Sequence, residues 1–352
     1  MIFNRTEKEE KAYLMDIIAL LAANIEQMDK AIEDKSKDVM EHKLYLWENL
    51  SELDRAEKSA VRQIVTQQVA ASESLAEKKK RYRKMMAIPY FGRIDFQEKG
   101  QPEVLPLYIG IHSFFNPPTN ENLIHDWRAP ISSMFYDYEL GEAHFDAPSG
   151  EVKGNIRLKR QYRIRDGKME FMLESSLNIQ DDILQKELSG NSDDQMKNIV
   201  ATIQREQNKI IRNDTSNTLI IQGVAGSGKT SIALHRVAYL LYRHKGEITS
   251  NDILIISPNK VFADYISNVL PELGEEKIEE CGFEELMLKI LDNKYKIQTF
   301  FDQVAEILDK EEEDFIERIR FKSTTEFIQQ MDKYILYLEQ NAFRPTDLKA
   351  GR

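Results

Sequence analysis

The sequence predicts an α/β protein in which an N-terminal antiparallel coiled-coil hairpin and a β-rich segment precede an incomplete domain built around a phosphate-binding loop. Three observations support this prediction. Residues 5–85 contain neither glycine nor proline, as long helices require. Residues 89–175 alternate short apolar runs with turn residues, and residues 223–230 read GVAGSGKT.

The first element is the hairpin, because apolar residues in the first half of 5–85 recur at alternating spacings of four and three, the seam of a coiled coil. This row is Leu14, Ile18, Leu21, Ile25, Met28, Ile32, Val39 and Leu46, with Lys35 and His42 interrupting it. The return half is less regular. Its expected facing row is Leu53, Ala60, Ile64, Ala71 and Leu75. We expect the chain to reverse near residues 47–59 and each arm to reach about 50 to 60 Å.

The second element is β-rich, since residues 89–175 are enriched in β-branched and aromatic side chains between turn signals. Within it, YRIRDGKMEFML predicts a β-hairpin around Asp166-Gly167. The tail is expected to be helical and acidic. The expected domains are an arm at 1–88, a β-rich segment at 89–178, the phosphate-binding domain at 179–283 and a helical region at 284–352.

Composition restricts the class of protein. The chain is 41% hydrophobic and 30% charged, with a formal charge of −11, which argues against a protein that coats nucleic acid and leaves only a local basic groove possible. One cysteine cannot form an internal disulfide, and the six histidines lack zinc-site spacing. The apolar run at 17–25 is too short to span a bilayer and no basic n-region precedes it. We expect a cytoplasmic protein without a signal peptide or membrane anchor.

The phosphate-binding loop matches G-x-x-x-x-G-K-[ST] at every fixed position. Its glycines allow backbone amides to surround phosphate oxygens, Lys229 is expected to reach the β- and γ-phosphates, and the Thr230 hydroxyl to bind Mg²⁺. TLIIQ before the loop predicts a buried strand, TSIALHRVAYLLY after it an amphipathic helix, and DILIISP a second strand. The expected ATP-binding residues here are Gly223, Val224, Ala225, Gly226, Ser227, Gly228, Lys229 and Thr230.

Hydrolysis of ATP needs more than this loop. A P-loop ATPase also uses an acidic residue at a strand end to hold Mg²⁺, a group that orients water, and usually an arginine. The chain contains no Asp-Glu dipeptide, and we expect the acidic runs after residue 274 to be helical. We therefore assign no catalytic residue.

Several of these stretches resemble a known family. IQREQNKIIRN, the loop, ALHRVAYLL and ILIISPNKVFADYISNVLPELG are similar to the opening motifs of superfamily 1 helicases of the UvrD/Rep kind. The hairpin, PYFGRIDF, YIGIHSF and DWRAPISSMFYDYELGEAHFDAPSGEVKGNIRLKRQYRI resemble the HelD family of RNA polymerase-associated helicase-like ATPases. The resemblance covers about residues 5–285. It implies a partial first RecA-like domain at 179–283 and the start of a helical insertion at 284–352. The chain lacks the family's second RecA-like domain, so we expect a truncated product or an N-terminal fragment.

The resemblance also implies roles for individual residues. Gln207 falls where these helicases bind the adenine ring, with a surface helix glutamine as the alternative. Arg236 matches an arginine near the nucleotide, and a solvent-facing or salt-bridged helix residue is the alternative. Ser257, Pro258, Asn259 and Lys260 match a motif that contacts single-stranded DNA, and we favour a plain turn capped by Asn259. The implied cofactors are ATP and Mg²⁺.

The resemblance gives the arm a partner, RNA polymerase core, whose secondary channel such an arm enters. The expected tip carries Glu48, Glu52, Asp54 and Glu57, which would compete for a cationic channel and its metal. The alternative is a hairpin end kept soluble by charge. The basic run at 77–86 could pair with an acidic surface of the polymerase or with nucleic acid. Its pattern favours the alternative, a solvated helix face.

The motif IHDWRAP is assigned no chemistry. Successive strand residues point to opposite faces, so His125 and Asp126 do not form a dyad. Trp127 is predicted to be a core anchor and Asp126 with Arg128 a structural ion pair.

The leading hypothesis is the N-terminal part of a HelD-like ATPase that binds RNA polymerase and uses ATP to remodel or recycle it. One alternative is a fragment of a UvrD/Rep-type ATP-dependent DNA helicase that translocates on single-stranded DNA. Another is a binding module that keeps the P-loop only as part of its fold.

Overall fold

The computed structural model describes residues 6–174, 203–257, 269–271, 273–292, 294–310 and 313–341. The chain forms two compact units: Met1–Ile255 with Asn259–Glu280, and Ile256–Pro258 with Cys281–Arg352. The hairpin, the sheet and the phosphate-binding loop belong to the first unit. Mixed α/β architecture is confirmed.

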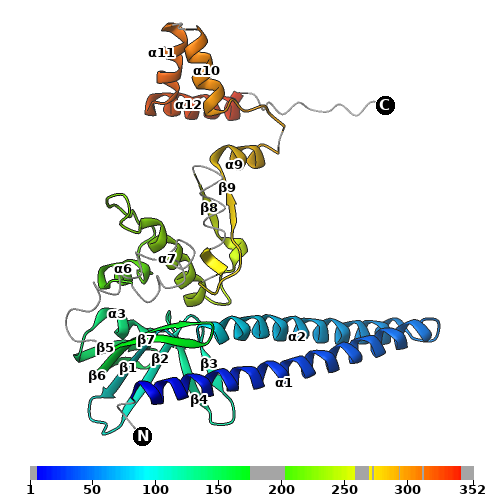
Figure 1. The fold of residues 1–352 in the computed structure, drawn as a ribbon. Helices are drawn as coiled ribbons and strands as arrows, with labels where there is room; N and C mark the ends of the chain where they lie inside the picture. Colours follow the sequence, from blue (N-terminus) through cyan, green and yellow to red (C-terminus); the bar gives the residue numbers. More distant parts are fainter. Residues whose placement is uncertain are drawn as a thin grey trace. The chain divides into compact units, whose positions relative to one another are not determined.

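The N-terminal hairpin consists of α1 (Glu7–Glu48) and α2 (Arg55–Ala87), which run antiparallel (Figure 1). The reversal at residues 49–54 lies inside the predicted interval. With 42 and 33 residues, the two helices extend about 63 and 50 Å at about 1.5 Å per residue. Capping boxes begin both helices, at Thr6 and at Asp54.

The predicted seam of α1 is confirmed. Leu14, Leu21 and Met28 are buried, and the row continues outward through half-buried positions. Lys35 and His42, expected to interrupt the row, are themselves half-buried in it. Long side chains with an apolar stem can fill such positions, so the row runs through them.

The predicted seam of α2 is partly wrong, because Ala60 and Ile64 are exposed. The half-buried row instead runs through Val61, Val65, Gln68, Ser72, Leu75 and Lys79. Polar residues at three of these positions hide the 3.5-residue period from a search for apolar residues. One of them, Lys79, forms an ion pair with Asp29 of α1.

The β-rich segment forms a seven-stranded sheet with the order β3-β4-β2-β1-β6-β5, and β7 pairs with β6. Only the β2–β4 pair is parallel among the described pairs of this sheet. The predicted hairpin at Asp166-Gly167 is confirmed: it joins β6 to β7, with positive φ values of 47° and 72°. The strands are β1 (Gly92–Glu98), β2 (Val104–Gly110), β3 (Phe114–Asn116), β4 (Glu121–Asp126), β5 (Gly141–Ala147), β6 (Gly150–Arg165) and β7 (Lys168–Glu174).

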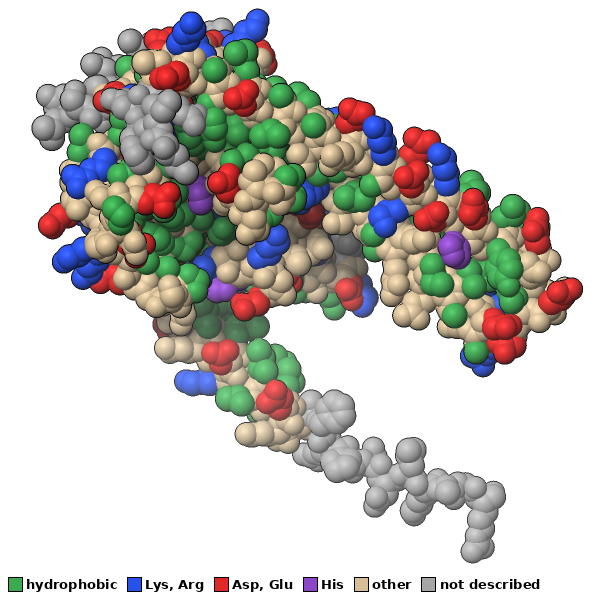
Figure 2. Space-filling view, turned by 90° about the horizontal axis from the view of Figure 1, so that it is seen from below, with side chains coloured by type: hydrophobic (Ala, Val, Ile, Leu, Met, Phe, Trp, Pro, Cys, Tyr) green, Lys and Arg blue, Asp and Glu red, His purple; other side chains and the backbone are tan. Residues whose placement is uncertain are grey.

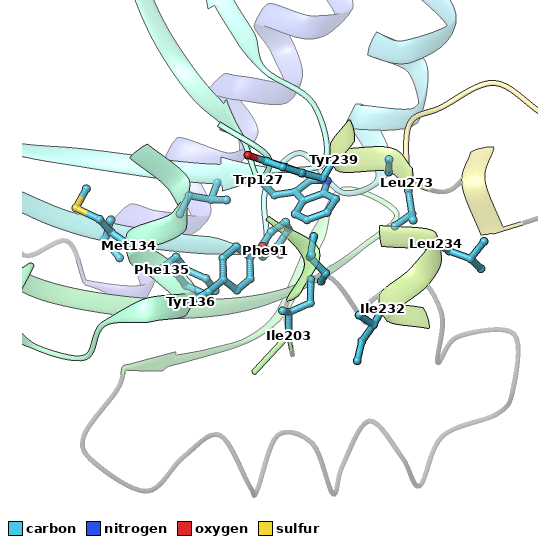
Figure 3. Packing of buried hydrophobic residues seen from close by; sticks show 14 of the residues in the cluster. Phe91, Trp127, Met134, Phe135, Tyr136, Ile203, Ile232, Leu234, Tyr239 and Leu273 are labelled. Atoms are coloured by element: carbon cyan, nitrogen blue, oxygen red, sulfur yellow. The ribbon is translucent and has the colours of Figure 1, made fainter. Parts of the chain in front are cut away.

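The sheet separates two apolar clusters, because successive strand residues point to opposite faces. On one face, which we call the arm face, Tyr108 packs against the ends of α1 and α2 that lie at the sheet, which we call the arm's root. The buried residues of this cluster include Leu14, Ile17, Leu21, Tyr82, Phe114 and Tyr162. Ile109 packs on the other face, the loop face, with residues of α6 (Arg205–Ile211) and α7 (Lys229–Arg243). Trp127 lies in this second cluster together with Tyr239, Ile232 and Leu234 of α7 (Figure 3).

A buried charge network joins α1 to the arm face. Arg93 of β1 donates to Asp95 at 2.6 and 2.8 Å and pairs with Glu10 of α1. Glu10 also accepts hydrogen bonds from Tyr108 Oη at 2.9 Å and from Arg160 Nη1 at 3.2 Å. Glu10 and Arg93 are fully buried, and burial raises the pKa of the Asp95 carboxyl. Each charge is therefore held by a partner of opposite sign.

Short elements complete the first unit: η1 (Pro130–Ser132) and α3 (Ser133–Asp137) follow β4, and η3 (Ser250–Asp252) follows α7.

The strands β8 (Leu254–Ile256) and β9 (Glu279–Cys281) form a two-stranded sheet. The described part of the tail, to residue 341, is largely helical, as predicted, and the rest lies outside the described residues. Its helices are α9 (Phe283–Ile290), α10 (Phe300–Lys310), α11 (Glu313–Lys322) and α12 (Thr325–Asn341).

One strand prediction and one helix prediction are wrong. Residues 218–222, predicted as a buried strand, are in no strand, and Ile220 is 86% exposed. A strand needs a hydrogen-bonded neighbour, and none of the described residues pairs with this segment. Conversely, Glu279 and Glu280 lie in β9 rather than in a helix, because this stretch pairs with β8.

Candidate nucleotide-binding site

Two glycines of the loop have a backbone conformation that favours glycine, and the third lies close to a side chain. Gly226 and Gly228 have φ values of +81° and +78°, a region that favours glycine. At Gly223, an added Cβ would lie 2.6 Å from Ser227 Oγ, so this hydroxyl would have to move if a larger residue stood there. The amide of Ser227 donates to the Val224 carbonyl at 3.2 Å, and residues 223–227 are exposed. The loop thus forms a solvent-facing turn closed by this bond.

Lys229 and Thr230 begin α7, a helix of 15 residues capped by Gly228. The Lys229 ammonium turns back over the loop and donates to the carbonyls of Gly223 at 3.0 Å and Val224 at 2.7 Å. A phosphate at the helix N-terminus would replace these neutral acceptors with charged ones. Lysine, helix end and glycines therefore fit the phosphates of a nucleotide.

Gln207 of α6 lies beside the loop, as its predicted adenine role requires. An added Cβ on Gly228 would be 3.8 Å from Gln207 Nε2, and Gln207 Oε1 accepts from the Gln204 amide at 3.1 Å. Two segments separated by about twenty residues of sequence thus place a carboxamide and a phosphate-binding turn together.

Arg236 is bound to the end of α6. Its Nη1 donates to the carbonyls of Ile210 at 3.1 Å and of Asn213. These bonds satisfy carbonyls that a helix C-terminus leaves without intrahelical partners. In this structure the guanidinium therefore links α7 to α6 through main-chain carbonyls.

α7 is held by its buried face. The buried side chains of this face include those of Ile232, Leu234, Ala238 and Tyr239. Beside them, the fully buried His235 packs edge-on against Trp127 at 5.6 Å between ring centroids, and burial lowers the pKa of its imidazole to about 4. This packing fixes the start of the helix, and with it the loop, to the sheet.

The IHDWRAP motif behaves as predicted. Trp127 is fully buried, and Arg128 donates to both carboxylate oxygens of Asp126 at 2.8 and 2.7 Å. Arg128 also pairs with Glu275 and lies 4.9 Å from the Tyr242 ring centroid. His125 contacts Asn122 rather than Asp126. The motif joins the sheet to α7.

Sequence reasoning missed the groups that hold α6: Asn208, Arg212 and Asp137. Asn208 is fully buried, and its Nδ2 donates to Asp137 Oδ1 at 2.9 Å while its Oδ1 accepts from Arg212 Nε at 3.0 Å. The only local signal is a polar residue on the apolar side of a short helix.

The acidic tip of the arm divides into two pairs. Asp54 and Glu57 form the capping box of α2, with bonds of 2.7 and 2.9 Å between each side chain and the other's amide. Glu48 and Glu52 are exposed. Figure 2 shows hydrophobic side chains beside acidic ones at this distal end, which includes the exposed Trp47 and Leu50.

The basic run near the arm's root is only partly free for contacts. Tyr82 is buried in the arm-face cluster, Lys79 is paired with Asp29, and Lys84 donates to the Pro271 carbonyl at 2.9 Å. Lys80, Arg81 and Arg83 are exposed.

A metal centre is not evident from side chains alone. Among the described residues no group of three or more His, Cys, Asp or Glu is placed to hold an ion.

Of the residues predicted to match the DNA-contacting motif, Ser257 is buried, whereas Pro258, Asn259 and Lys260 lie outside the described residues. In the same described part, no helix has the length and apolar character needed to cross a bilayer.

Comparison with known families agrees with this arrangement. Residues 7–192, more than half of the chain, match the family model for DNA helicase IV HelD, N-terminal domain. Residues 203–351 match the UvrD/REP helicase N-terminal domain, which implies ATP binding. No curated protein matches the chain.

Proposed function

The chain belongs to the HelD family of DNA helicase IV proteins, and we propose that it binds ATP with Mg²⁺ at residues 223–230. We propose further that it is the N-terminal part of an ATPase that remodels or recycles RNA polymerase. The geometry of the loop is the observation that carries the nucleotide part. Two glycines with positive φ, a lysine turned over the loop and a helix N-terminus form the proposed phosphate cradle.

Each residue of the cradle has a proposed task. Lys229 exchanges its two carbonyl acceptors for phosphate oxygens, the amides of 223–228 donate to the phosphates, and the Thr230 hydroxyl binds Mg²⁺. Gln207 binds the adenine edge. Bound ATP supplies the phosphoryl group whose transfer releases free energy, and Arg236 keeps α6 against α7.

The arm is the proposed contact with RNA polymerase core. Its distal half is long, exposed and carries Glu48 and Glu52 free of the capping box, which suits a cationic channel. We place the protein in the cytoplasm with the polymerase.

The polymerase contact is tested by pull-down of RNA polymerase core with the 352-residue chain. Combined reversal of Glu48→Lys and Glu52→Lys is expected to abolish retention, because two like charges then face the channel. Glu73→Lys, an exposed residue on α2 away from the tip, is the matched control and keeps retention. Equal retention by all three proteins contradicts the proposed contact.

A second candidate is a DNA helicase part that translocates on single-stranded DNA, favoured by the match of residues 203–351 to the UvrD/REP domain. It predicts binding to single-stranded oligonucleotides that weakens steeply with salt and is lost in Asn259→Ala with Lys260→Ala. Absence of such binding at low salt removes this candidate.

A further inference from the structure

We propose that Asp137 and Arg212 are positioning residues that hold Gln207 against the P-loop, residues 223–230. Because Asp137 belongs to the β-rich segment, contacts from this segment would help to set which base the nucleotide site prefers. The inference rests on the proposed ATP binding and deepens it by assigning the selection of adenine to contacts outside the loop. Neither residue touches the loop itself.

The first contact joins α6 to α3. Asn208 is fully buried and uses both ends of its carboxamide: Nδ2 donates to Asp137 Oδ1 at 2.9 Å, and Oδ1 accepts from Arg212 Nε at 3.0 Å. Because a buried amide without partners is costly, this residue has one well-satisfied position. α6 cannot rotate about its axis without breaking both bonds.

The second contact joins the end of α6 to the sheet and to α7. Arg212 Nη2 donates to the Trp127 carbonyl at 2.6 Å and Nη1 to the Arg128 carbonyl at 2.9 Å. Its guanidinium lies 5.3 Å from the centroid of the Tyr239 ring on α7. One planar side chain thus fixes α6 relative to both the sheet and the P-loop helix.

Gln207 is the neighbour of Asn208, so the position of one sets the position of the other. Gln207 Oε1 accepts from the Gln204 amide at 3.1 Å, and Nε2 lies on the side of Gly228. Rotation of the amide by half a turn would set its NH₂ against the Gln204 N–H. The carboxamide is therefore held in one orientation.

A carboxamide in one orientation distinguishes purines. Adenine presents the N6 donor beside the N7 acceptor, which matches one oxygen and one NH₂. Guanine presents two acceptors, O6 and N7, so one of them would face the amide oxygen. The held amide favours ATP over GTP, while the phosphate cradle treats both alike.

The test measures dissociation constants of ATP, GTP and inorganic tripolyphosphate, with Mg²⁺, for the 352-residue chain by calorimetry. Asp137→Ala is expected to weaken ATP about fivefold, the effect of about one hydrogen bond, and to leave GTP and tripolyphosphate unchanged. Arg212→Lys, which loses the planar fork, behaves the same way. Asp137→Asn keeps the acceptor for Asn208 and restores ATP affinity.

The control is Asp214→Ala, a carboxylate after α6 whose described partner is Arg243 at 3.4 Å, and it should leave all three constants unchanged. If Asp137→Ala weakens the three ligands equally, or does not affect ATP, the positioning role is wrong although the site binds nucleotide. If the unaltered chain binds none of them, the proposed function itself is wrong, and the inference with it. Retained binding of tripolyphosphate shows that a variant is folded at the loop.

Discussion

The two faces of the sheet are joined to their neighbours by different chemistry. On the arm face, buried side-chain charges meet each other: Glu10 of α1 meets Arg93 and Arg160. On the loop face, an apolar cluster packs beside the Arg128–Asp126 ion pair, and Arg212 bonds to main-chain carbonyls. Both faces carry an apolar cluster, and the difference lies in the polar links: α1 is joined to the sheet by charge pairs, whereas α6 is held by main-chain carbonyls bonded to Arg212 and by the Asn208 amide.

The two tryptophans provide the largest expected contrast. Trp127 is fully buried on the loop face, and Trp127→Ala should lower the free energy of unfolding by about 3 to 5 kcal/mol because a large cavity remains. Trp47 is 79% exposed near the arm tip, and Trp47→Ala should leave unfolding unchanged. Urea unfolding followed by circular dichroism measures both, and equal losses would contradict the assigned burial.

The charge network is tested by Glu10→Ala. Removal of this buried carboxylate leaves Arg93 and Arg160 without one of their partners and should cost about 3 to 5 kcal/mol of stability. Glu7→Ala is the control one turn earlier on the same helix, where the exposed pair with Lys11 contributes little. A small effect of Glu10→Ala on the melting temperature would mean that the arm does not depend on this network.

Stability should decrease in mild acid because of two buried imidazoles. Burial lowers the pKa of His112 and of His235 from 6.5 to about 4. Between these values the unfolded chain binds protons that the folded chain does not, so stability is complete above pH 6.5 and falls as the pH drops toward 4. At pH 5 each group should cost about 2 kcal/mol relative to pH 7.

His235→Asn isolates one of these contributions, because an amide can still donate to the Ser231 carbonyl. The variant is expected to lose stability at both pH values, but its difference between pH 7 and pH 5 should shrink by about 2 kcal/mol. An unchanged difference would show that His235 does not titrate with unfolding.

The smallest expected effect separates the two pairs of acids at the tip. Asp54→Ala should lower stability by about 1 kcal/mol, because the N-cap of α2 is lost. Glu52→Ala, on an exposed residue, should leave thermal unfolding unchanged. If both substitutions behave alike, the division of the tip into capping and free acids is wrong.

Much of the fold follows from local pattern. The 3.5-residue row of α1, the turn at Asp166-Gly167 and the core role of Trp127 depend on neighbours in sequence, and each was predictable. The α2 row was only partly predictable, since Gln68 and Lys79 occupy seam positions where apolar residues were sought.

The site shows the same division. The loop is recognisable because its phosphate chemistry needs fixed residues at fixed spacing. The link from Asp137 through Asn208 to Arg212 spans 75 residues and involves common polar types, so no local pattern announces it. The absence of a strand at 218–222 likewise depends on which neighbours pair with it, which no local pattern reports.

The central claim is that residues 223–230 bind the phosphates of ATP. Isothermal titration of ATP with Mg²⁺ into the chain and into Lys229→Ala tests it most directly, with Lys245→Ala, an exposed lysine beyond α7, as the control. We predict saturable binding to the unaltered chain and to the control, and at least tenfold weaker binding to Lys229→Ala, since a charge-assisted contact contributes about 1.5 to 3 kcal/mol. Equal binding by all three proteins, or none by the unaltered chain, would contradict it.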